Sequence, residues 1–140
     1  MTVPRAIELE VSRRAEQRCE YCQMHQSLQG ATFHVEHIIP RSRNGSTQLD
    51  NLAWACPGCN LRKSDRVEVP SANADELVRL FNPRLDRWDV HFAWQRYVVR
   101  GLTPIGRATV DALCLNDERR LRIRQAEEWF GLFPPDERTG

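Results

Sequence analysis

The stretch HVEHIIP, residues 34–40, mixes β-branched apolar residues with side chains that bind metal ions or move protons. Its apolar members favour a strand that is buried, and Pro40 ends that strand because proline cannot donate to a strand ladder. Burying polar groups is unfavourable unless a partner satisfies them. Three polar residues of the strand are therefore ligands of a metal site, members of a catalytic site, or core residues whose polar groups are hydrogen-bonded: His34, Glu36 and His37.

Two C-x-x-C pairs flank this stretch, CEYC at 19–22 and CPGC at 56–59. One such pair alone fits a redox motif equally well. In a reducing compartment, two such pairs in one chain of 140 residues indicate a single tetrahedral zinc site, with Cys19, Cys22, Cys56 and Cys59 as thiolate ligands. Zinc bound there would staple together the ends of the segment that contains HVEHIIP, which is a structural role. The fifth cysteine, Cys114, lies in the apolar run VDALCL and is expected to be a buried thiol.

The composition fits one domain with a modest core, since 41% of the 140 residues are hydrophobic. No apolar run approaches the ~18 residues of a membrane span, and charges occupy the N-terminal stretch where a signal peptide is apolar. These features predict a cytoplasmic protein that neither spans nor binds a membrane. Of 20 basic residues only Lys63 is a lysine. The arginine bias suits phosphate binding, and genome composition explains it equally well.

The hydrophobic pattern predicts an α+β fold. Pro4 and the spacing after it favour an N-terminal helix, although Ile7, Leu9 and Val11 also alternate as in a strand. Strands at 33–39 and 51–55, joined by an exposed loop, lead into a short helix over 56–66.

The rest of the chain shows weaker signals. Residues 67–75 have the composition of a connector, and alternating apolar residues at 90–94 predict a strand. Thr103 and Pro104 begin a helix, Asn116 caps a last helix that ends near Gly131, and the final PPDERTG is expected to fray.

The polar residues of the core suggest a second metal site. Glu36 and Asn60 offer oxygen ligands, which suit a hard cation such as Mg²⁺. His37 titrates near neutral pH and can act as a base. Asn60 directly follows Cys59, so the cysteine pair fixes its backbone.

Three spaced elements, E-H-I-x-P at 36–40, N-L at 51–52 and C-x-x-C-N-x-x-K at 56–63, resemble the HNH endonuclease family. The resemblance implies a ββα-metal core with zinc knuckles over 19–66, within a single domain 1–140, and a C-terminal extension over 67–140 packed on that core. Two tail segments, LFNPRLDRWDVHF and GLTPIGRATVDAL, are more loosely similar to small bacterial stand-alone HNH proteins.

The resemblance also implies a metal-dependent endonuclease that nicks or cuts DNA, with double-stranded DNA as the expected partner. His37 is then the general base, Asn51 bonds across the loop to hold the strands in register, and Glu36 and Asn60 hold one Mg²⁺ or Mn²⁺. Phosphate contacts are implied for Lys63, Arg62 and Arg66. Two further arginines in the exposed loop either contact the DNA backbone or stay solvated, Arg41 and Arg43.

Glu36 and Asn60 stand where the family often has Asp and His. Both keep an oxygen donor, and this pair favours Mg²⁺ or Mn²⁺ over Zn²⁺ or Ni²⁺ at the catalytic site.

Two alternatives stay open. Zinc nucleobase deaminases carry H-x-E and P-C-x-x-C, which His34, Glu36, Cys56 and Cys59 partly match, but Ala55 precedes Cys56 where proline is required. The other alternative is a zinc-stabilised nucleic-acid-binding module without catalysis. His34 has no role in the nuclease scheme.

Overall fold

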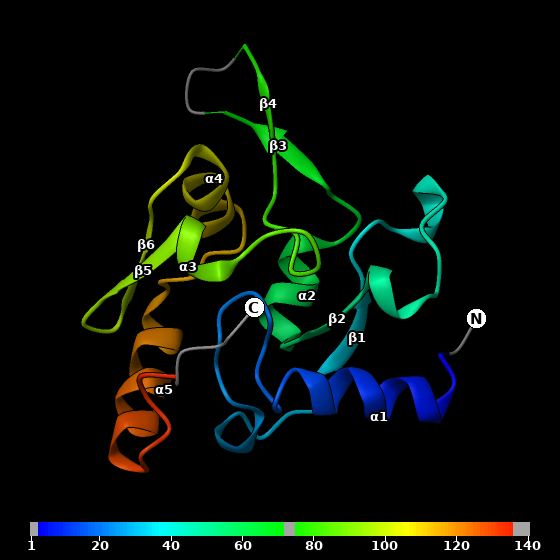
Figure 1. Ribbon diagram of the computed structural model, residues 1–140. Helices are drawn as coiled ribbons and strands as arrows, with labels where there is room; N and C mark the ends of the chain where they lie inside the picture. The colour runs from blue at the N-terminus through cyan, green and yellow to red at the C-terminus, as the bar shows by residue number, and fades with distance from the viewer. Residues whose placement is uncertain (1–2, 72–74, 136–140) are drawn as a thin grey trace.

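The computed structural model describes residues 3–71 and 75–135, and these form an α+β fold (Figure 1). Small two-stranded antiparallel sheets alternate with helices along the described chain. The predicted fold class is confirmed. The expectation that the final PPDERTG frays falls almost entirely outside the described residues.

A strand–strand–helix unit lies at the centre of the molecule (Figure 1). Strand β1 (His34–His37) pairs with β2 (Leu52–Ala55), and helix α2 (Pro57–Lys63) follows at once. All four residues of β2 are buried, as expected for an apolar strand covered on both faces. Cys56 caps α2 by accepting a hydrogen bond from the Cys59 amide. This order is the one predicted from the sequence.

The N-terminal segment is helical, which decides against the strand alternative. Helix α1 (Arg5–Arg14) begins after Pro4, whose fixed φ suits a first helical turn, and it buries Val11. Arg14 donates a hydrogen bond to the Leu52 carbonyl, which ties α1 to β2. Residues 15–25, which include Cys19 and Cys22 and are called the cysteine loop, and the 3₁₀ turn η1 (Gln26–Leu28) connect α1 to β1.

The loop between β1 and β2 contains two short 3₁₀ turns, η2 (Arg41–Arg43) and η3 (Leu49–Asn51). Asn44 adopts a left-handed conformation with φ of 66°, a turn geometry that asparagine tolerates. The predicted turn at Asn44-Gly45 is therefore present.

The C-terminal extension contains two hairpins and three helices within the described residues, and their bounds follow. The strands are β3 (Glu68–Pro70), β4 (Leu77–Arg79), β5 (Phe92–Gln95) and β6 (Val98–Gly101), and the helices are α3 (Trp88–His91), α4 (Pro104–Ala112) and α5 (Glu118–Trp129). Both predicted helices are present. The strand predicted at 90–94 is present only from Phe92, because Val90 belongs to α3.

Three local expectations for the extension are wrong. Residues 67–75 include β3, which pairs with β4, so the segment is more than a connector. Asp117, not Asn116, caps α5, while the Asn116 side chain bonds both backbone groups of Val99. Cys114 is only partly buried, with Arg62 Nη1 3.2 Å from its sulfur.

Polar and aromatic contacts hold the extension against the central unit. The Trp88 indole donates to the Tyr21 carbonyl at 2.9 Å, and Arg84 pairs with Glu20. Tyr21 also packs edge-on against Phe81. One cluster of buried apolar residues runs through both parts, from Val11 to Leu115. None of the described helices is long and apolar enough to cross a membrane.

Candidate metal centre and active site

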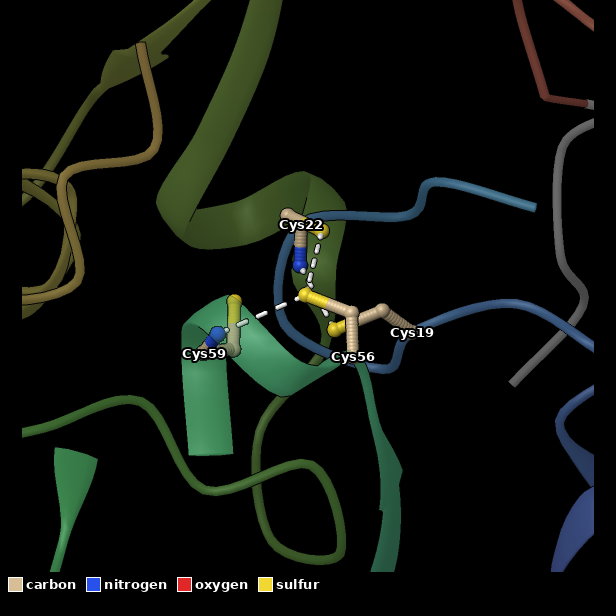
Figure 2. Close-up of side chains that lie close together, drawn as sticks. All are labelled: Cys19, Cys22, Cys56 and Cys59. Atoms are coloured by element: carbon tan, nitrogen blue, oxygen red, sulfur yellow. Dashed lines mark hydrogen bonds between the residues drawn. The ribbon is translucent and has the colours of Figure 1, made fainter. Parts of the chain in front are cut away.

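The four cysteines predicted as zinc ligands come together in one buried cluster (Figure 2). Cys19 and Cys22 lie on the loop after α1, and Cys56 and Cys59 lie at the start of α2. Their sulfur atoms all lie within 4.8 Å of one another, and all four cysteines are free thiols.

The geometry of this cluster fits zinc. Tetrahedral zinc with Zn–S bonds of ~2.3 Å places its sulfurs about 3.8 Å apart. The Sγ atoms of Cys22 and Cys56 are 3.8 Å apart. The Cys22 amide faces Cys19 Sγ at 3.5 Å, and the Cys59 amide faces Cys56 Sγ at 3.4 Å. These N–H groups support negative charge on the sulfurs.

Arg120 of α5 reaches this cluster from the extension. Its Nη1 donates to Cys59 Sγ at 3.1 Å, although only 2% of the side chain is exposed. A Cβ on Gly58 would lie 2.8 Å from Arg120 Nη2, so glycine makes room for the guanidinium. Burial tends to lower the pKa of Arg120, but the neighbouring cysteine thiolates outweigh it and raise that pKa. A permanent cation therefore lies beside the predicted thiolate ligands.

The cysteine thiols differ in how readily they ionise. Burial raises the pKa of the Cys19 and Cys59 thiols. Hydrogen bonds from the neighbouring thiols, with Cys19 the largest contributor, lower the pKa of Cys56. Such a cluster favours bound cations, because a cation relieves the cost of several buried thiolates.

Glu36, the predicted ligand of the catalytic cation, belongs to β1. Its side chain lies between Tyr21 of the cysteine loop and Lys63 of α2. Its carboxylate accepts a hydrogen bond from the Tyr21 hydroxyl at 2.5 Å through Oε2. Lys63 Nζ lies 2.6 Å from Oε1, and both side chains are almost completely buried. Burial raises the pKa of Glu36, against the opposing effect of Lys63.

The two carboxylate oxygens of Glu36 are not equivalent. Oε1 lies 2.6 Å from Lys63 Nζ, and the same ammonium donates to the Ile38 carbonyl at 2.8 Å. Oε1 therefore faces a positive charge in a buried site. A carboxylate oxygen is the ligand type that a hard cation prefers, and this fits the predicted role of Glu36.

Asn60 stands one helical turn before Lys63 on α2 and is half-buried. Because Lys63 contacts Glu36, this turn of α2 faces β1. The structure thus places Glu36 and Asn60 on facing elements.

His37 follows Glu36 on β1 and is only half-buried. Adjacent residues of a strand project to opposite faces, which separates the histidine from the buried carboxylate. His37 Nε2 lies 3.0 Å from the Thr47 hydroxyl, a contact that orients the ring. Burial, and then the charge of Arg41, lowers the pKa of His37. The neutral imidazole is therefore favoured near neutral pH.

Asn51 bonds across the loop in the way the resemblance implies. Its Oδ1 accepts from the Ile39 amide at 2.9 Å, and its Nδ2 donates to the carbonyls of Ile39 and Ser46 at 3.0 and 2.8 Å. Gly45 is required beside it, since a Cβ there would lie 1.7 Å from the Ile39 oxygen. This clamp fixes the end of β1 that carries His37.

The basic residues predicted to touch phosphate occupy different environments. Arg41, Arg43, Arg62 and Arg66 are exposed. Arg43 pairs with Glu68 at 3.0 Å, and Arg66 donates to the Ala112 carbonyl at 3.3 Å. Lys63 differs from the expectation: it is 1% exposed and turned inward, so it is not available to nucleic acid in this structure.

The ligand set of the deaminase alternative does not assemble. Cys56 and Cys59 are grouped with Cys19 and Cys22 in a buried cluster, whereas His34 is exposed and does not join that cluster. The structure does not support that alternative.

Two residues of the site were missed at the sequence level. Tyr21 lies between the two cysteines of CEYC, and this position alone was a signal that its side chain is fixed. Arg120 lies 61 residues after the cysteine it contacts, within an arginine-rich helix, and nothing in the sequence distinguishes it from its neighbours.

Comparison with known families matches residues 19–66 to the HNH endonuclease family. These residues hold the four cysteines, β1, β2 and α2, so the predicted resemblance of this segment to the family is confirmed. An HNH segment indicates a nuclease-type function on nucleic acid.

Among curated proteins, the chain is 27% identical to the Septu protein PtuB of Bacillus thuringiensis over 119 residues. The aligned region covers 82% of this chain and only 43% of that relative's length. The similarity therefore extends beyond the HNH segment into the C-terminal extension. No solved structure matches the chain.

Proposed function

We propose that the chain is a metal-dependent endonuclease that hydrolyses phosphodiester bonds in DNA, by nicking or by cutting both strands. The observation that carries the proposal is that the three separated family elements fold into one unit. In this unit α2 contacts the carboxylate of Glu36, and Asn51 clamps the strand that carries His37.

His37 acts as the general base. Its lowered pKa keeps the ring neutral, so that it can accept a proton from the attacking water. Thr47 holds the ring through the contact at Nε2, and the Asn51 clamp holds the backbone behind it. General base catalysis of this kind contributes about 10²–10⁴-fold to the rate.

Glu36 and Asn60 would hold one Mg²⁺ or Mn²⁺. Such a cation, when bound, orients the scissile phosphate and stabilises the charge on the leaving oxygen. The buried carboxylate oxygen Oε1 of Glu36, which lies 2.6 Å from a positive charge, supports this role. Zinc at the four cysteines is structural in this proposal, because a closed Cys₄ set leaves no open position for water.

Exposed arginines around the unit supply the contacts to the DNA backbone, namely Arg41, Arg43, Arg62 and Arg66. Guanidinium groups bind phosphate oxygens in a bidentate manner, which positions a duplex without reading its sequence. Four reduced cysteines in the core are consistent with a reducing compartment, and we propose the cytoplasm.

A plasmid assay tests this function. Zinc-loaded protein is incubated with supercoiled plasmid, with Mg²⁺ or Mn²⁺ added or withheld. We expect nicking that requires the added cation and falls at least about 100-fold in His37→Ala, the lower bound for a lost general base. Asn60→Ala should show a comparable loss that excess Mn²⁺ partly restores.

His34→Ala is the matched control, because it removes an exposed histidine from the same strand. It should retain nicking. Plasmid binding without cleavage under every cation would reject the nuclease and favour the non-catalytic binding module. Cleavage that persists in His37→Ala would reject the assigned base.

A further inference from the structure

A lysine ammonium is buried beside the carboxylate that is proposed to bind a cation. Lys63 Nζ lies 2.6 Å from Glu36 Oε1, and the side chains are 2% and 4% exposed. A buried lysine is costly unless it is paired, and here its partners are the carboxylate and the Ile38 carbonyl. The positive charge therefore occupies the place beside Oε1 that a metal cation would take.

We propose that the Lys63 ammonium is a stand-in for the divalent cation. It occupies the place beside Glu36 Oε1 and must leave that place when the cation binds Glu36. This inference rests on the proposed function, because it assumes that Glu36 is a cation ligand. It adds that the site exists in two exclusive states, with the ammonium inward or with the metal bound and the ammonium released.

The charges and space around Glu36 support this exclusion. Glu36 has one carboxylate, Tyr21 already occupies Oε2, and no third acidic or cysteine ligand joins Glu36 in a metal-binding group among the described residues. An ammonium and a divalent cation at the same oxygen would repel each other strongly in a buried environment. Tyr21 stays in place in both states, since its backbone is fixed between two zinc-site cysteines.

The position of Lys63 on α2 determines where its side chain would move after release. Lys63 is the last residue of α2, so rotation about its flexible side chain moves the ammonium from β1 toward the outer surface of the helix end. Exposed Arg62 and Arg66 flank that end. Cation binding would in this way add one positive charge to the surface that we propose for DNA phosphates.

The sequence makes this testable with little ambiguity, because Lys63 is the only lysine of the chain. The zinc-loaded protein is treated with an amine-acylating reagent, with and without Mg²⁺, and acylation at Lys63 and at the N-terminal amine is measured by mass spectrometry. The N-terminal amine serves as the internal reference. We expect Lys63 to be protected without Mg²⁺ and to react at least several-fold faster with it.

A second measurement uses Mn²⁺ binding, followed by electron paramagnetic resonance of the free ion near pH 8. Lys63→Met removes the competing ammonium while keeping a long side chain. It should bind Mn²⁺ about tenfold or more tightly than the unchanged protein, at the lower end of coupling between close charges. Arg119→Met, which removes an exposed arginine without a role in the proposed site, should leave Mn²⁺ affinity unchanged.

The outcomes separate this inference from the proposed nuclease function. Protection of Lys63 that survives saturating Mg²⁺, or a protein that binds neither Mg²⁺ nor Mn²⁺, overturns the stand-in role even if plasmid is cleaved. A cation-dependent rise in Lys63 acylation without any plasmid cleavage supports the stand-in role and rejects the nuclease. If Lys63→Met does not fold, the acylation of the unchanged protein still decides.

Discussion

At the scale of single residues, Asn51 and Glu20, buried polar residues in and beside the central unit, have specific partners that fix their positions. Asn51 uses both ends of its amide to clamp the loop, and Glu20 accepts from the Trp54 amide at 2.8 Å. Leaving such groups unpaired would cost about 1–3 kcal/mol each. The same accounting explains why the buried Glu36 is engaged by Tyr21 and Lys63.

His37 gives a prediction at this scale. Burial and then the charge of Arg41 lower its pKa, so the neutral base persists to lower pH than for an ordinary histidine. Removing the positive charge in Arg41→Gln should raise the pKa of His37, because protonation no longer meets that repulsion. The acidic limb of the rate profile should then move to higher pH.

The ring proton of His37, followed by NMR across the pH range and identified by its loss in His37→Gln, measures this directly. Arg43→Gln is the control, since Arg43 lies in the same loop but pairs with Glu68. An unshifted titration in Arg41→Gln would contradict the electrostatic argument.

At the scale of elements, the cysteine cluster joins three segments rather than two. The cysteine loop and α2 supply the sulfurs, and α5 supplies the Arg120 guanidinium. Tetrahedral zinc with four thiolates carries a net charge of about −2, which is costly in a buried site. Arg120 offsets part of that charge, and Arg124, fully buried one turn later, is anchored by the Leu115 and Tyr97 carbonyls.

We therefore predict that Arg120→Met weakens zinc binding by about 10–100-fold, the usual effect of removing a hydrogen bond to a metal ligand. Competition against a chromogenic chelator measures it. Arg119→Met is the matched control, because Arg119 is exposed on the same helix. Equal zinc affinity in both variants would show that Arg120 only packs α5.

At the scale of the whole molecule, the extension and the central unit have one continuous apolar core. Contacts at Tyr21, Glu20 and Cys59 all join residues after 80 to the cysteine loop or α2. Loss of zinc should therefore affect both parts together, although the extension holds none of the four cysteines.

Stripping zinc with a strong chelator tests this coupling. A structural zinc contributes about 10–16 kcal/mol in small zinc domains, which is as large as the usual stability of a folded protein, about 5–15 kcal/mol. We expect one cooperative loss of far-UV circular dichroism and of tryptophan fluorescence, which reports mainly the extension because three of the four tryptophans lie there, Trp88, Trp94 and Trp129. Added zinc should restore both. Fluorescence that persists after the dichroism is lost would show that the extension folds by itself.

The sequence alone determined the central unit. Apolar strands that end at Pro40 and at Cys56, a turn at Asn44-Gly45 and two cysteine pairs are local patterns, and the strand–strand–helix order and the cysteine cluster follow from them. Such patterns succeed because strand burial, turn geometry and metal-ligand spacing depend on residues close together in sequence.

Only the tertiary structure decided which partners the long side chains choose. Lys63 turns inward because a buried carboxylate attracts its ammonium more than solvent does. Arg120 contacts Cys59 although the two residues are 61 positions apart in the sequence. The β3–β4 hairpin was missed because its strands have three residues each, too short for a period to appear. Charge pairing in a buried site depends on distances that no sequence spacing encodes.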